Sequence, residues 1–219
     1  MGVSVYYWAV PPSSEIFKRL QTDEAFLGLM GVLFHHGSGM FHFFTELDDE
    51  EGEEILTDAV HRYARLFGPE PAARRLIEEF RHLVEETRRH HPGIERRRCT
   101  LNKTQRILLD RLPNVLGNVR DDAAAFVEKL VFGDRQHGVL EAIKSSGRKC
   151  SDNPGYECGG FVSLALVRDG ARVLSAIDTE TALSEELADA PWELESFLRW
   201  RDLYADASAH GEVLFVGVC

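Results

Sequence analysis

The chain lacks the features that mark membrane-bound, exported and nucleotide-hydrolysing proteins. None of its apolar runs approaches the roughly 20 residues of a membrane-spanning helix, and its N-terminus has neither the basic segment nor the small-residue cleavage site of a signal peptide. A glycine-rich phosphate loop, a Gly-x-Ser-x-Gly nucleophile elbow and the protein-kinase motifs are also missing. We therefore expect a cytoplasmic protein with no membrane association.

Positive charge is in the minority, since 25 Lys and Arg residues stand against 36 Asp and Glu residues, for a net charge of −11. General nucleic-acid binding depends on cationic contacts to phosphates, so this balance argues against it and favours a basic protein partner. Acidic residues concentrate at the start of one predicted helix, where the helix dipole also stabilises them without any partner. These residues are Glu46, Asp48, Asp49, Glu50, Glu51, Glu53 and Glu54.

One stretch of this acidic chain is basic, and its centre is Arg96, Arg97 and Arg98. These three residues are a candidate anion site, and the alternative is a solvated helix end and loop. Arg outnumbers Lys among the basic residues, a bias typical of GC-rich bacterial genomes, so we expect a bacterial origin.

The apolar pattern predicts an α+β fold in one domain, with a small mixed sheet that includes both terminal strands. Residues 46–146 form a helical region that could be a subdomain, interrupted by a charged, aperiodic joint at 90–103. Strands are predicted at 3–10 and 212–218, and a hairpin at 161–167 and 171–177 turns at Arg168-Asp169-Gly170. Helices are predicted at 15–21, 23–34, 49–67, 70–90, 103–112, 121–132, 138–145 and 191–209.

Both ends of the chain resemble one family. The opening Gly2-Val3-Ser4-Val5-Tyr6-Tyr7-Trp8-Ala9-Val10-Pro11 and the closing segment from Leu198 to Val216 are similar to the YfbM-like bacterial proteins of unknown function. The likeness covers roughly a fifth of the chain. It implies a small α+β fold in a bacterial cytosol and brings no activity or functional residues with it.

The segment from Cys150 to Cys158 is the strongest candidate for chemistry. A turn at Pro154-Gly155 would bring the two thiols close enough for a disulfide or a shared metal, although the Cys-x2-Cys spacing of zinc and redox sites is absent. Whether these two cysteines pair stays open. In a cytosolic protein, thiols are normally reduced.

Cys158-Gly159-Gly160-Phe161-Val162 resembles the nucleophile motif of NlpC/P60-type thiol enzymes, in which the cysteine begins a buried helix. A helix N-terminus lowers the pKa of a thiol, and a histidine then acts as the base. The resemblance implies a hydrolase or transferase that uses Cys158 with His210. The alternative is a turn that enters a buried strand, and the apolar run with its Arg-Asp-Gly turn favours that alternative.

His36 and His42 flank a glycine-containing turn near several carboxylates, a residue set that suits a divalent transition metal. The alternative is a surface loop, and we predict no other cofactor. The function best supported by the sequence is therefore a non-catalytic binding or regulatory module. The second hypothesis is a thiol-dependent enzyme.

Overall fold

The computed structural model describes residues 4–35, 50–66, 68–102, 104–117, 120–136, 160–177 and 191–218. These residues form an α+β protein, as predicted. The chain divides into two compact units. The first unit comprises Met1–Ala9, Arg97–Arg135 and Gly160–Val216, and the second comprises Val10–Arg96, Gln136–Gly159 and Gly217–Cys219.

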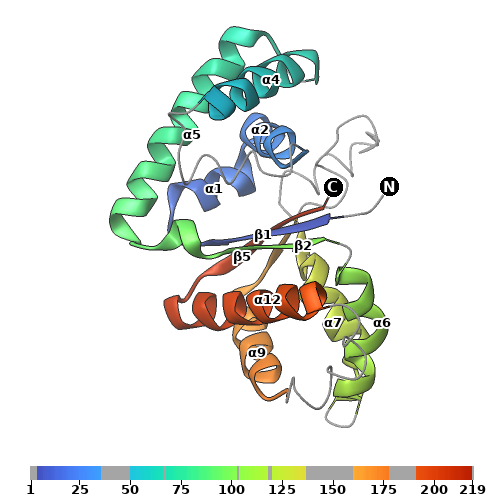
Figure 1. Cartoon of the computed structure of the whole chain (residues 1–219). Helices are drawn as coiled ribbons and strands as arrows, with labels where there is room; N and C mark the ends of the chain where they lie inside the picture. Colours follow the sequence, from blue (N-terminus) through green and yellow to red (C-terminus); the bar gives the residue numbers. More distant parts are fainter. Residues whose placement is uncertain are drawn as a thin grey trace. The chain divides into compact units, whose positions relative to one another are not determined.

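The strands form a five-stranded sheet in the order β2-β1-β5-β4-β3 (Figure 1). The first and last strands are neighbours in it, which confirms the prediction that both belong to one sheet. Strand β1 runs antiparallel to β2 with Tyr7 opposite Cys99, and β4 runs antiparallel to β5 with Phe161 opposite Phe215. The strands are β1 (Ser4–Val10), β2 (Arg98–Asn102), β3 (Arg135–Gln136), β4 (Gly160–Val162) and β5 (Val213–Val218).

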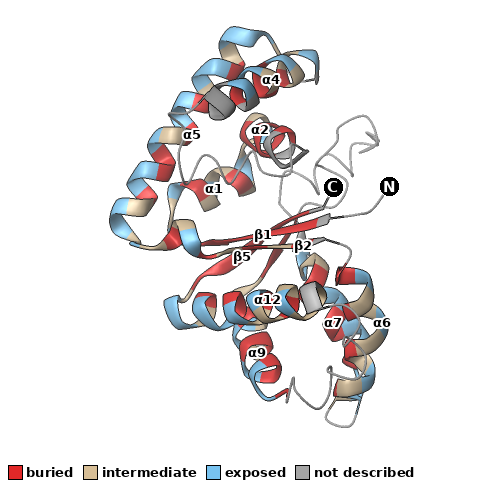
Figure 2. Cartoon of the chain, in the orientation of Figure 1, coloured by how far each residue is buried: buried red, intermediate tan, exposed pale blue. Residues whose placement is uncertain are grey.

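Four of the described helices belong to the first unit: α6 (Thr104–Leu116), α7 (Ala123–Phe132), α9 (Leu164–Ser175) and α12 (Pro191–His210). Helix α12 packs against α9 and β2, and α6 packs against α7. The strands and the inner helix faces are buried, whereas the outer helix faces are exposed (Figure 2). The core includes large aromatic side chains that are almost wholly inaccessible: Tyr7, Trp8, Phe197, Trp200 and Tyr204.

Two buried tyrosines from other elements donate hydrogen bonds to the C-terminal end of helix α7. The last carbonyls of a helix have no partner within it, and the Tyr204 hydroxyl donates to the Leu130 carbonyl at 2.6 Å while the Tyr7 hydroxyl donates to the Val131 carbonyl at 2.7 Å. Burial raises the pKa of both tyrosines well above 10.0. Residues from a strand and from a distant helix therefore satisfy two of the last carbonyls of α7.

The second unit is helical, with α1 (Glu15–Thr22), α2 (Glu24–His35), α4 (Glu50–Leu66), α5 (Glu70–His90) and the short 3-10 helix η1 (Ile94–Arg96). The Ser14 hydroxyl accepts from the Phe17 N–H at 3.2 Å and thereby caps α1. Helices α2, α4 and α5 pack against one another, and the Phe26 and Phe80 rings meet edge to face at 5.8 Å.

The predicted hairpin at 161–177 is wrong. Strand β4 ends at Val162, and the following residues form helix α9, so Arg168-Asp169-Gly170 lies within a helix. Gly170 is there because of packing: a Cβ on it would lie 2.8 Å from side-chain atoms of Leu130 and of Tyr204. The glycine allows the helices to approach closely. In the sequence, a glycine required for helix packing cannot be distinguished from a glycine in a turn.

The predicted joint at 90–103 contains a strand that sequence reasoning missed. Strand β2 spans Arg98–Asn102, and its pairing with β1 decides its conformation despite its charged start. Of the helices predicted within 46–146, α4 and α5 belong to the second unit, whereas α6 and α7 belong to the first. The helix predicted at 138–145 lies outside the described residues. None of the described helices is long and apolar enough to span a membrane.

Candidate ligand-binding site

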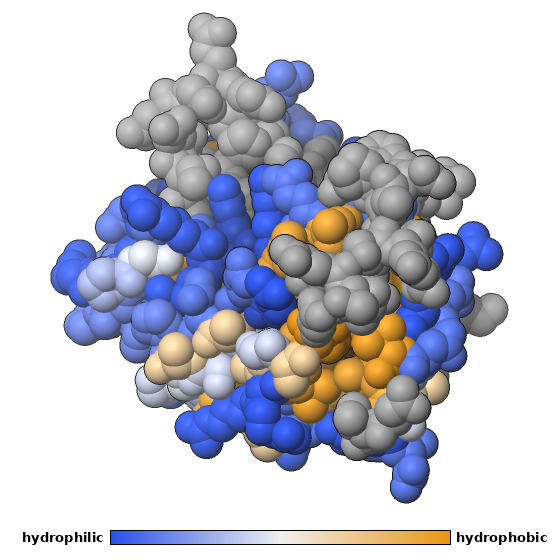
Figure 3. Space-filling view, turned by 60° about the horizontal axis from the view of Figure 1, so that its bottom comes forward, coloured by the Kyte–Doolittle hydropathy of each residue, from blue (hydrophilic) through white to orange (hydrophobic). Residues whose placement is uncertain are grey.

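A cavity of about 350 Å³ opens between the C-terminal halves of α6 and α9 in the first unit. Five of its seven described lining residues are apolar, and the other two are arginines. The lining residues are Val115, Leu116, Arg120, Arg172, Val173, Ala176 and Ile177. Apolar side chains gather, with hydrophilic ones around them, on the face that Figure 3 brings forward, where α6 and α9 lie.

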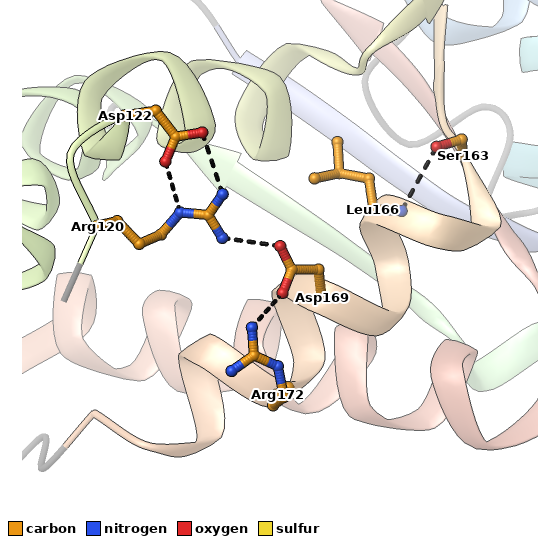
Figure 4. A network of polar contacts seen from close by, with 6 residues as sticks. All are labelled: Arg120, Asp122, Ser163, Leu166, Asp169 and Arg172. Atoms are coloured by element: carbon orange, nitrogen blue, oxygen red, sulfur yellow. Dashed lines mark hydrogen bonds and ion pairs between the residues drawn. The ribbon is translucent and has the colours of Figure 1, made fainter.

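The position of α9 is set at its first turn. The Ser163 hydroxyl accepts from the Leu166 N–H at 3.4 Å and thereby caps the helix (Figure 4). The Asp134 carboxylate accepts from both the backbone N–H and the hydroxyl of Ser163 at 2.6 Å. A carboxylate beside a helix N-terminus is also stabilised by the helix dipole. These contacts fix the start of the helix whose other end forms one wall of the pocket.

Arg120 connects α9 to the start of α7 at the edge of the pocket. Its Nε and Nη2 donate to the two carboxylate oxygens of Asp122 at 2.8 and 3.1 Å, and its Nη1 donates to Asp169 at 2.7 Å. Arg172 donates to the other oxygen of Asp169 at 2.5 Å, and Figure 4 shows the four side chains as one continuous chain of contacts. The network therefore alternates carboxylates and guanidinium groups.

The charges in this network stabilise one another. Hydrogen bonds from Arg120 hold the pKa of Asp122 and of Asp169 below the usual value for aspartate, so both remain ionised at neutral pH. The same bonds, first of all the one with Asp122, raise the pKa of Arg120. Its guanidinium carbon also lies 3.7 Å from the centroid of the Phe126 ring, a cation–π contact that restricts its position further.

A second groove lies in the other unit, between α4 and α5, with a volume of about 130 Å³. Two arginines border it, Arg74 and Arg81, but Glu78 lies among its lining residues and accepts a hydrogen bond from Arg81 at 3.2 Å. The α6–α9 pocket is larger, and its described lining contains no acidic residue. It is therefore the stronger candidate for a ligand site.

The three arginines of the predicted anion site have different surroundings. Arg96 extends into solvent with 89% of its side chain exposed, whereas Arg97 is buried and donates two hydrogen bonds of 2.7 Å to the carboxylate of Glu212. Arg98 is half-buried, and burial lowers its pKa. The bidentate pair shows that Arg97 already holds a carboxylate of this chain.

His210, the predicted catalytic base, is the last residue of α12, and its exposed ring donates through Nδ1 to the Asp206 carbonyl at 2.8 Å. His90 makes the same contact with the Glu86 carbonyl at the end of α5, at 2.9 Å. The shared geometry is that of a histidine at a helix C-terminus. The predicted partner of His210, Cys158, lies outside the described residues.

The other predicted sites also lie outside the described residues. They are the metal site at His36 and His42 and the possible pairing of Cys150 with Cys158. Among the residues that the structure does describe, no three His, Cys, Asp or Glu side chains gather as metal ligands. Cys99 is buried beside Tyr7 on the neighbouring strand, and burial raises the pKa of its thiol to about 12. A thiol with such a pKa stays protonated and is a poor nucleophile at neutral pH.

Sequence reasoning missed the α6–α9 pocket. Arg172 lies three residues after Asp169, a helical ion-pair spacing, but the predicted turn hid this signal. Arg120 is 49 residues from Asp169, and no local pattern connects them. No family model, curated protein or solved structure matches this chain. The resemblance of its ends to YfbM-like proteins therefore stays a prediction.

Proposed function

We propose that the chain is a non-catalytic binding module whose α6–α9 pocket takes a small organic molecule with an apolar body. The observation that carries the proposal is the pocket itself, a cavity of about 350 Å³ with a mostly apolar described lining. Ligand pockets in proteins have volumes of roughly 300–1,000 Å³ and combine an apolar lining with a few polar groups. The pocket meets this description at the lower end of the size range.

The chemistry of the lining supports binding over catalysis. The described lining residues include no Ser, Cys, His, Asp or Glu, the side chains that act as nucleophiles or as acids and bases near neutral pH. Arginine stays protonated and works through hydrogen bonds and charge. The thiol-enzyme hypothesis for Cys158 and His210 stays a prediction, and nothing in the pocket depends on it.

Two further expectations accompany this proposal, one about partners and one about the location of the protein. The net charge of −11 supports a preference for basic protein partners over nucleic acid. The second expectation is a cytoplasmic location, which stays a prediction. Both concern surroundings of the protein and are independent of the pocket.

The test fills the pocket from its exposed side. Ala176 lines the cavity and is exposed, so Ala176→Phe places a ring in the cavity without opening the core. Ala125→Phe adds the same ring at an exposed position of α7 outside the pocket lining and is the matched control. We expect ligand-observed NMR with a panel of small aromatic and C6–C10 aliphatic compounds to detect binders that lose binding in Ala176→Phe and keep it in Ala125→Phe. The proposal is overturned if no compound binds, or if the bound ones ignore Ala176→Phe.

A further inference from the structure

We infer that the ligand of the α6–α9 pocket is an organic anion, with a carboxylate or similar oxyanion that Arg172 binds at the rim while the apolar body enters the cavity. The inference rests on the proposed function and specifies its ligand class. It follows from the way in which the charged network is divided between the pocket lining and its surroundings.

Both cations of the network line the pocket, and neither of its carboxylates does. Arg120 and Arg172 are lining residues, whereas Asp122 and Asp169, which they contact, are absent from the described lining. The carboxylates thus balance the arginines from outside the cavity. A ligand in the cavity meets guanidinium groups and apolar side chains, and this is the surface that complements an amphipathic anion.

The two arginines differ in what they can contribute. Arg120 has only 21% of its side chain exposed, and Asp122, Asp169 and Phe126 hold it in place. Arg172 has 74% of its side chain exposed, and its bond to Asp169 engages one of five guanidinium N–H groups. Arg172 is therefore the residue that can make a bidentate contact with a ligand carboxylate, and Arg120 is a fixed positive charge on the wall.

The network at the rim carries no net charge before a ligand binds. Arg120, Arg172, Asp122 and Asp169 sum to zero charge, because two cations face two carboxylates. The Arg172 side chain is 74% exposed before binding, and its charge-assisted hydrogen bond becomes stronger where the apolar body of a ligand displaces water from it. The groove between α4 and α5 differs in that Glu78 lies in its lining, so an anion bound there would lie beside a carboxylate.

The experiment compares carboxylates with their neutral amides. Pairs such as 1-naphthoate with 1-naphthamide, and octanoate with octanamide, have nearly the same apolar body and differ in charge. We expect isothermal titration calorimetry to show the carboxylate of a pair binding at least about tenfold more tightly than the amide. Arg172→Gln removes the charge and the fork of donors, so this preference falls to near unity while the amide binds as before.

Arg168→Gln is the matched control, because Arg168 is exposed on the same helix, one turn earlier, and is not a lining residue. It keeps the carboxylate preference. Arg172→Lys keeps the charge without the planar fork and gives an intermediate preference. Circular dichroism checks that each variant is folded. We expect all of them to fold, because Arg168 and Arg172 are exposed.

The outcomes separate the two claims. If carboxylate and amide bind equally and both are lost in Ala176→Phe, the anion inference is wrong and the proposed function stands. If the preference survives Arg172→Gln, the anion is bound elsewhere and the inference is also wrong. If no member of the panel binds to the wild-type protein, the proposed function itself falls.

Discussion

Removing the hydroxyl of Tyr204 or Tyr7 tests whether these two residues complete the end of helix α7. In Tyr204→Phe the Leu130 carbonyl loses its 2.6 Å hydrogen bond, and in Tyr7→Phe the Val131 carbonyl loses its 2.7 Å bond. Both tyrosines are fully buried, so water has no direct route to replace the lost donor. The rings remain, and with them most of the apolar packing.

The expected loss follows from the cost of a buried polar group without a partner. Leaving a buried carbonyl unsatisfied lowers the free energy of unfolding by about 1–3 kcal/mol. With a urea slope of about 2 kcal/mol per molar, each variant lowers the midpoint of urea unfolding by roughly 0.5–1.5 M. The slope itself stays unchanged, because the same surface is exposed on unfolding.

Tryptophan fluorescence is the suitable probe, because Trp8, Trp192 and Trp200 all fall within the first unit. The control is Ser208→Ala on α12, which deletes a half-buried hydroxyl that donates to no carbonyl among the described residues. It leaves the midpoint within the error of the measurement. A midpoint shift below about 0.2 M in both tyrosine variants refutes the capping argument, since that corresponds to only about 0.4 kcal/mol.

Alkaline pH gives a second readout, which reports the burial of the two hydroxyl groups. Burial raises the pKa of Tyr7 and Tyr204 well above 10.0, whereas both titrate near 10 in the unfolded chain. Their contribution to stability is complete below pH 10 and is lost as the pH rises above it, because only the unfolded state then releases the protons. The loss is about 1.4 kcal/mol per pH unit for each tyrosine. The double variant Tyr7→Phe/Tyr204→Phe lacks this part of the alkaline slope.

Two other perturbations address the same unit. Glu212→Gln leaves the buried Arg97 guanidinium without its counter-charge, so we expect the free energy of unfolding in urea to fall by about 3–5 kcal/mol. The double variant Arg97→Met/Glu212→Leu removes both charges and recovers most of this loss. A double variant as unstable as Glu212→Gln contradicts this account. Gly170→Ala puts a Cβ 2.8 Å from Leu130 and Tyr204 atoms, so crowding outweighs the better helix propensity of alanine and lowers the melting temperature. Gly68→Ala is the control, because the added Cβ meets open space and does not lower the melting temperature. Equal melting temperatures for Gly170→Ala and Gly68→Ala would count against crowding at Gly170.

Most of the elements were predictable because their signals are local. The Ser14 cap, the three-and-four apolar spacing in α5 and the apolar and aromatic run in β1 each arise within a few residues, and the structure contains all three elements. The hairpin and the joint were wrongly predicted because distant contacts decide the conformation there. Strand β2 forms because β1 pairs with it, and Gly170 allows close helix packing against Tyr204 although the same tripeptide is typical of turns.

The candidate pocket could not be predicted, because its residues come from elements that are far apart in the sequence. Val115 and Ile177 line the same pocket, and Arg120 meets Asp169 only once α9 lies beside α7. The predicted sites at Cys158, His36 and His42 came from short motifs, which a sequence displays directly, and these residues lie outside the described part of the chain.

The sequence by itself determined the α+β class, the helices with strong periodicity, the two terminal strands and the acidic charge, since each depends on composition or on neighbours along the chain. Only the tertiary structure decided which arginines line an apolar cavity and which are buried in an ion pair: Arg97 is buried against Glu212, while Arg172 remains exposed at the rim of the pocket. The physical reason is that a guanidinium group becomes a binding group or a structural ion pair according to its neighbours in space, and folding alone brings those neighbours together.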